Sequence, residues 1–102
     1  MKTGTILSGS YRDCHYFYRV VKATDKTVWL EELNTYLFSP KESYIRDDGE
    51  MPDLVSPGTP IKKSFRIKIS ENGIEYIKKN DHCFLYIWNG VHAKIHIGTL
   101  IK

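Results

Sequence analysis

Residues 15–36 read HYFYRVVKATDKTVWLEELNTY, and this stretch decides the fold. It contains two runs rich in Val, Tyr, Phe, Trp and Thr, separated by a short polar break at Asp25 and Lys26. β-Branched and aromatic side chains fit a pleated, half-buried surface, and such a break between two runs indicates a hairpin. Phe17 and Tyr18 give both faces of the first strand an apolar residue. This is typical of a central strand, or of a small barrel whose outer face is covered.

The clearest strand outside this hairpin lies at residues 62–70, which read KKSFRIKIS. Apolar and polar side chains alternate along it. A period of two directs Phe65 and Ile67 toward a core, and Arg66 and Lys68 toward solvent. The segment is therefore expected to be half buried, with a basic outer face.

Shorter runs complete the predicted sheet. We expect further strands at residues 3–8, 74–78, 83–88 and 93–97, the first at an edge and the last closing the sheet. Asn-Gly pairs at residues 72–73 and 89–90 are tight-turn signals. No stretch has helical periodicity over a dozen residues. The predicted fold is all-β: a small antiparallel barrel or barrel-like sandwich of six to seven strands.

One long acidic, proline-rich loop is expected at residues 38–60. The four prolines of the chain fall in it: Pro40, Pro52, Pro57 and Pro60. Proline removes a backbone donor and does not fit inside a sheet ladder, so the segment should cross the surface. A chain of 102 residues is otherwise one domain, residues 1–102.

The charge distribution is uneven, although the net charge is only +3 and the pI is about 8.8. Charge alone indicates a nucleic-acid-binding domain only when the pI is above about 9, and the pI of this chain is below that value. The N-terminus lacks the apolar run of a signal peptide, and no stretch approaches the roughly 18 apolar residues of a membrane span. We therefore expect a cytoplasmic protein with free thiols at Cys14 and Cys83 and no membrane partner.

Metal and catalytic sites are not expected. The pairs Cys14-His15 and His82-Cys83 together hold the residues of a zinc site. However, adjacent strand residues point to opposite faces, and neither pair has the spacing of a structural zinc motif. Asp13 beside the first pair would supply a third group for nucleophilic catalysis, but consecutive residues rarely form such a triad. No cofactor motif is present, and we expect a protein that is not an enzyme.

A basic strand face is one candidate binding surface. Its members would bind the phosphates of nucleic acid and stack on a base: Lys62, Lys63, Arg66, Lys68, Lys78, Lys79 and Tyr76. Tyr86 and Trp88 are the alternative stacking residues. Small barrels that bind single strands combine a basic groove with stacked aromatic residues. The simpler interpretation is a solvated sheet face whose lysines prevent edge-to-edge association.

Several motifs resemble a group of small accessory proteins of phages and mobile elements. The similar segments read GTIL at residues 4–7, FYRVVK at 17–22, KTVWL at 26–30 and YIWNG at 86–90. The group's pattern is Gly-x-Ile-Leu, Phe-Tyr-x-Val-Val, Lys-Thr-Val-x-Leu and Trp-Asn/Asp-Gly. The resemblance covers both ends of the chain and leaves residues 38–60 unmatched. It implies an accessory protein that binds host machinery, as anti-CRISPR proteins do.

The leading functional hypothesis is accordingly a non-enzymatic inhibitor of a host nucleic-acid-handling defence protein, such as a Cas nuclease or its guide complex. An acidic loop can imitate a phosphate backbone and enter a channel lined by Lys and Arg. Its contact residues would be Asp47, Asp48, Glu50 and Asp53. The alternatives are a nucleic-acid-binding barrel that uses the basic face, and a phage structural or assembly component. For the inhibitor we expect a monomer or a weak homodimer.

Overall fold

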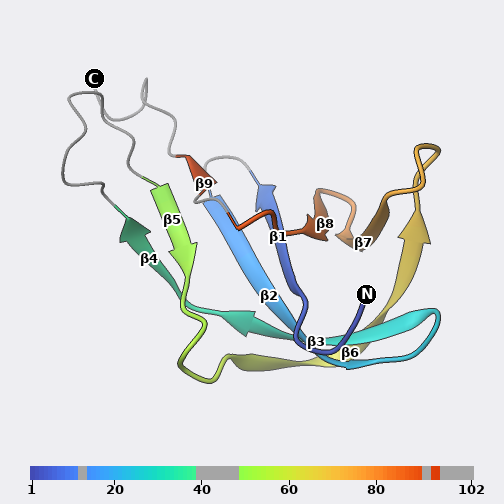
Figure 1. The fold of residues 1–102 in the computed structure, drawn as a ribbon, viewed down its shortest axis with the longest axis horizontal. Helices are drawn as coiled ribbons and strands as arrows, with labels where there is room; N and C mark the ends of the chain where they lie inside the picture. Colours follow the sequence, from blue (N-terminus) through green and yellow to red (C-terminus); the bar gives the residue numbers. More distant parts are fainter. Residues whose placement is uncertain (12–13, 39–48, 91–92, 95–102) are drawn as a thin grey trace.

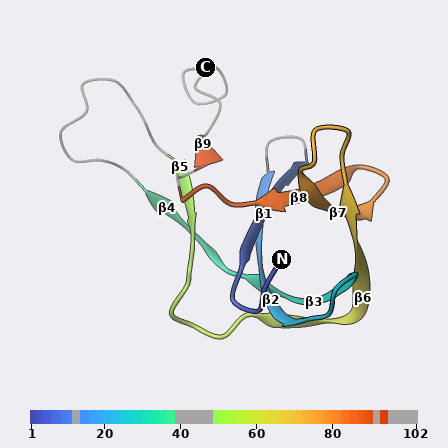
Figure 2. The same ribbon diagram turned by 45° about the vertical axis from the view of Figure 1, so that its right-hand side comes forward.

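The computed structural model describes residues 1–11, 14–38, 49–90 and 93–94, with the backbone alone at 11, 14, 37, 38, 49, 50, 93 and 94. Six antiparallel strands form a closed barrel (Figures 1 and 2). They are β1 (Ile6–Tyr11), β2 (Cys14–Ala23), β3 (Thr27–Leu33), β6 (Thr59–Ile69), β7 (Glu75–Asn80) and β8 (Cys83–Ile87). Each strand pairs with the next in that order, and β8 pairs with β1. The predicted small antiparallel barrel is confirmed.

A second, three-stranded sheet lies beside the barrel (Figure 2). Its order is β4 (Thr35–Phe38), β5 (Gly49–Pro52) and β9 (Ala93–Lys94). Part of the expected loop at residues 38–60 is therefore strand, and β6 begins earlier than predicted. Pro52 ends β5 and Pro60 is the second residue of β6, so both lie near strand ends, where a missing backbone donor is tolerated.

The barrel closes at a different place from the one predicted. β8 pairs with β1 through Leu7 opposite Ile87 and Ser8 opposite Tyr86, so β1 is not an edge strand. Residues 93–97 were expected to close the sheet, but Ala93 and Lys94 pair with β5 in the second sheet, and residues 95–97 lie outside the described part. Pairing partners of short strands depend on how the sheet coils, which a single strand's sequence does not encode.

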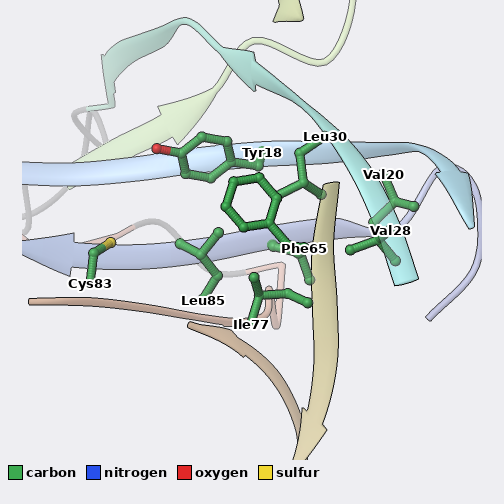
Figure 3. Close-up of a cluster of buried hydrophobic side chains, with 9 residues drawn as sticks. Tyr18, Val20, Val28, Leu30, Phe65, Ile77, Cys83 and Leu85 are labelled. Carbon is green, nitrogen blue, oxygen red and sulfur yellow. The ribbon is translucent and has the colours of Figure 1, made fainter. Parts of the chain in front are cut away.

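The predicted central hairpin is β2 and β3. The amide of Thr24 donates to the carbonyl of Thr27 at 2.8 Å, which fixes the turn at the polar break. One face of each barrel strand supplies the core drawn in Figure 3. Its buried residues are Leu7, Tyr18, Val20, Val28, Leu30, Phe65, Ile77, Cys83 and Leu85.

The outer face of the hairpin is covered around Phe17. Phe17 points away from the core yet is fully buried, opposite Leu33 in register and edge-on to Trp88 at 5.9 Å between ring centroids. Beside it, Arg19 donates to the Glu31 carboxylate at 2.7 Å and to the Leu54 carbonyl at 2.6 Å. The predicted covered outer face is therefore found at Phe17, whereas Val21, further along β2, is 44% exposed.

Gly9 permits the close approach of β1 and β8, which leads to a stability prediction. A Cβ at this position would lie 2.6 Å from Leu85 Cδ2 and 2.7 Å from the Phe84 carbonyl oxygen. Gly9→Ala should therefore lower the free energy of unfolding by about 1–3 kcal/mol, the usual effect of overpacking. Urea unfolding measures it, and Ser10→Ala, at the exposed neighbouring position, should change stability by less than about 0.5 kcal/mol. Equal stability of the two variants would contradict this account.

Candidate nucleic-acid interface

The outer face of β6, β7 and β8 carries a group of aromatic and basic side chains. Ile77 and Leu85 are buried in the barrel, so the residues that alternate with them point outward. The outward residues are Arg66 and Lys68 of β6, Tyr76 and Lys78 of β7, and Phe84 and Tyr86 of β8. We call these six residues the aromatic–basic face.

The three rings of this face contact one another. Tyr76 stacks on Tyr86 with 5.8 Å between ring centroids and 29° between planes, and it meets Phe84 at 6.2 Å. Phe84 and Tyr86 nevertheless remain 40% and 47% exposed. Large aromatic side chains are usually buried when a small domain can bury them. The rings therefore form one continuous, solvent-exposed apolar surface and are not scattered singly over the barrel.

Backbone pairing determines which residues are neighbours on this face. Lys68 lies opposite Tyr76, Tyr76 opposite Tyr86, and Tyr86 opposite Ser8, so one row crosses four strands. In the next row Lys78 lies opposite Phe84. Each row consequently places a cation directly beside an aromatic ring.

The cations of the face are exposed. Arg66 and Lys68 are exposed on β6. Lys78 Nζ lies 3.4 Å from an Asp81 carboxylate oxygen, but both side chains are exposed, at 42% and 87%. An exposed pair of this kind contributes little free energy and is readily exchanged for another anion. A phosphate can therefore compete for Lys78.

The remaining predicted basic residues are Lys62 and Lys63, further along β6, and Lys79 of β7. Lys62 and Lys63 are exposed on β6, beside a shift in its register with β3, and Lys63 Nζ lies 5.7 Å from the Phe65 ring centroid. Lys79 points inward, because it follows the outward Lys78. The sequence-based grouping thus combined residues from two sides of the barrel wall.

Lys79 meets the buried tyrosine of β2 inside the end of the barrel. Its ammonium donates to Tyr18 Oη at 2.5 Å and lies 4.9 Å and 5.4 Å from the ring centroids of Tyr18 and Tyr16. Burial raises the pKa of Tyr18, so its phenol is neutral at physiological pH. Burial also lowers the pKa of Lys79, but the hydrogen bond and charge of Tyr18, with the charges of Cys83 and Glu32, outweigh it and the net shift is upward.

The acidic residues of the inhibitor hypothesis are only partly described. Asp47 and Asp48 lie outside the described residues, and Glu50 is known by its backbone in β5. Asp53 has a structural role, because its carboxylate accepts hydrogen bonds from the amides of Val55 and Ser56 at 3.0 and 3.1 Å. The bonds from Ser56 are the main reason that the pKa of Asp53 is lowered, so the group is charged at neutral pH.

Other sites can be assessed within the described part of the chain. It contains no group of three or more His, Cys, Asp or Glu side chains that could hold a metal ion. Cys83 is a buried free thiol whose pKa is raised by burial, and the side chain of Cys14 is not described. Among the residues described, none belongs to a helix long and apolar enough to cross a membrane.

Comparisons with known proteins add no relative. No protein-family model matches the chain, and searches of curated proteins and of solved structures returned no match. The resemblance to accessory proteins of phages stays a prediction. Any function assigned to this chain rests on its own residues.

Sequence reasoning omitted Phe84 and gave Tyr86 only as an alternative stacking residue. Both lie in CFLYI, which is apolar at all five positions and therefore does not reveal which side of the strand faces solvent. The buried inner residues Cys83 and Leu85 settle that question only once the barrel is formed. The alternation of Tyr76 and Lys78 around the apolar Ile77 in β7 was the available signal for the outer face next to them.

The three titratable groups inside the barrel end predict that the fold loses stability at alkaline pH. Tyr18, Lys79 and Cys83 all have a pKa raised in the folded state, so folding favours their protonated forms. Their contribution to stability is complete below the pKa values of the unfolded chain. It is lost as the pH rises through the pKa values of the folded protein, and the loss begins above the ordinary thiol pKa of about 8.5. The urea midpoint should fall from about pH 8.5 upward.

Two variants test the origin of this fall. Lys79→Met should make the fall steeper between about pH 8.5 and 10, since the Lys79 charge lowers the pKa of Tyr18 and Cys83 and its removal lets burial raise both further. Lys78→Met, one residue along and outside the barrel, should retain the slope of the unmodified protein. The same slope in Lys79→Met as in the unmodified protein would refute the assignment to this cluster.

Proposed function

We propose that the protein binds single-stranded nucleic acid on the aromatic–basic face. The observation that carries this proposal is the exposed pair Phe84 and Tyr86 in contact with the half-buried Tyr76, with Lys68 and Lys78 directly opposite members of this trio in register. Proteins that bind single strands use this combination: bases stack on aromatic rings while Lys and Arg follow the phosphates. Small β-barrels commonly present such a surface on their strands.

A single strand fits this face better than a duplex. Bases in a duplex are stacked on each other, so side chains reach their edges in the grooves rather than their faces. Exposed rings on a barrel wall can stack only on bases that are already unpaired. The face has few groups that would discriminate between base edges, so we expect weak sequence preference, with stacking and backbone contacts supplying most of the affinity.

The cations of the face predict a moderate salt dependence. Three basic side chains, Arg66, Lys68 and Lys78, adjoin the rings. For single strands, the slope of log affinity against log salt is about −0.7 for each phosphate contact. Three contacts would give a slope near −2. A much steeper slope would indicate that the strand extends to Lys62 and Lys63.

The first binding prediction concerns the rings. Tyr86→Ala should weaken binding of a fluorescein-labelled single strand of about 12 nucleotides by about five- to a hundredfold, the range for loss of one stacked base. Fluorescence anisotropy at fixed salt measures it. Tyr36→Ala is the matched control, because Tyr36 is 50% exposed, close to the 47% of Tyr86, but lies on β4 of the second sheet. Equal losses in both variants would exclude this face as the stacking surface.

The basic side chains are tested on the same assay. Arg66→Glu combined with Lys68→Glu should reduce affinity and flatten the salt slope, since two phosphate contacts become repulsive. Lys2→Glu makes a charge change of the same kind on the exposed N-terminal segment and should have little effect. Binding that survives the double substitution would reject direct nucleic-acid binding through this face.

A second candidate function is inhibition of a host nucleic-acid-handling defence protein. It is supported by the resemblance to phage accessory proteins and by the carboxylates of Asp47, Asp48, Glu50 and Asp53 in residues 38–60. The target would be a Lys- and Arg-lined channel, such as that of a Cas nuclease or its guide complex.

The carboxylates of residues 38–60 test this candidate. A variant with Asp47→Asn, Asp48→Asn, Glu50→Gln and Asp53→Asn should lose a host protein that the unmodified chain captures from nuclease-treated bacterial lysate. The loss follows because the steering and pairing charges are gone. Undiminished capture would eliminate phosphate mimicry, and capture of nucleic acid alone, abolished by nuclease, would favour the aromatic–basic face.

A further inference from the structure

A cavity opens at the end of the barrel, on the inner side of the β7–β8 hairpin. Its volume is about 220 Å³, and its described lining residues are Tyr16, Lys79, Asn80, His82 and Cys83. A water molecule occupies about 30 Å³ of liquid volume, so this space is large enough for a small ligand group together with some water. The cavity is separate from the aromatic–basic face, because Lys79 and Cys83 point to the opposite side of the wall from Lys78 and Phe84.

Lys79 supplies a positioned positive charge in this cavity. Tyr18 Oη accepts one of the three ammonium hydrogen bonds at 2.5 Å, and the rings of Tyr16 and Tyr18 hold the side chain from two sides. The raised pKa of Lys79 keeps the ammonium charged near neutral pH. Glu32 acts on this charge from β3, but it is not among the described residues that line the cavity. Lys79 is therefore oriented before any ligand arrives.

The hairpin turn adds polar donors next to this charge. Asn80 Oδ1 accepts a hydrogen bond from the backbone amide of His82 at 2.9 Å. Because its carbonyl end is used within the turn, the amide NH₂ of Asn80 is the end that can donate to a ligand. The His82 imidazole lies at the same rim. The turn between β7 and β8 thus places Asn80 and His82 on the same cavity as the Lys79 ammonium.

We propose that this cavity binds a phosphate group, held by the Lys79 ammonium and the Asn80 amide. A tetrahedral oxyanion accepts hydrogen bonds from several directions, which suits donors that converge without the planar fork of an arginine. Lysine acts as a point charge toward phosphate. Its long side chain is flexible, but the hydrogen bond to Tyr18 holds the Lys79 side chain in one orientation. The group can come from free phosphate or from the terminal phosphate of a nucleic-acid strand.

Inorganic phosphate, with ionic strength held constant by chloride, is the first probe. Amide NMR spectra should show saturable shifts at residues 80–83 in the unmodified protein and in the control variant Lys2→Met, whose lysine is exposed on the N-terminal segment. Lys79→Met should raise the dissociation constant at least about tenfold, the usual effect of losing one charge-assisted hydrogen bond. Shifts that do not saturate, or an unchanged dissociation constant in Lys79→Met, would overturn the proposal.

A milder variant separates binding from barrel stability. Tyr18→Phe keeps both rings and the ammonium but removes the oxygen that orients it, so it should weaken phosphate binding several-fold in a folded protein. It decides the question if Lys79→Met does not fold. A purely structural contact between Tyr18 and Lys79 would lower the urea midpoint of both variants and leave the phosphate titration unaltered, which would count against a ligand site.

Two single strands of the same sequence, with and without a terminal phosphate, distinguish the sources. If the phosphorylated strand binds more tightly and this gain disappears in Lys79→Met, the cavity binds the terminal phosphate of a strand. Phosphate binding without such a gain would assign it to the free ion. The aromatic–basic face is tested separately by Tyr86→Ala, which should leave the inorganic phosphate titration unchanged, so failure of either proposal is recognised independently.

Discussion

The pairing of β8 with β1 is the constraint on which the remaining structure depends. It turns six strands into a closed sheet and thereby gives every strand an inside and an outside. The strands can approach because Gly9 has no Cβ to meet Leu85 and the Phe84 carbonyl. Closure also removes the free edge of the barrel sheet, through which an exposed strand would associate with other chains.

The division into inside and outside gives adjacent residues of one hairpin different properties. Lys78 remains in solvent beside Phe84, while its neighbour Lys79 reaches Tyr18 at the end of the core. The same alternation buries Cys83 and leaves the next residue on the surface. A charged residue can lie inside the barrel end because an aromatic hydroxyl and two ring faces take the place of water.

The hydrophobic core explains why the aromatic residues of β7 and β8 remain exposed. Nine inner residues form the core of the barrel, and Phe17 on the outer face of β2 is covered by Leu33 and Trp88. The outer face of β7 and β8 has Tyr76, Phe84 and Tyr86 in contact with each other instead. Exposed aromatic residues that are ordered by mutual contact cost little conformational entropy when a ligand stacks on them.

The sequence by itself determined the class of fold and the faces of its most regular strands. The alternation in β6 identified Phe65 as inner and Lys68 as outer, and the polar break placed the turn of the central hairpin, because both features are local and follow from side-chain periodicity. Only the tertiary structure decided which strands close the barrel, that Phe84 and Tyr86 face solvent, and that Lys79 lies inside. Those outcomes depend on pairing between residues distant in sequence, and an all-apolar strand or a Lys-Lys pair carries no local signal of its orientation.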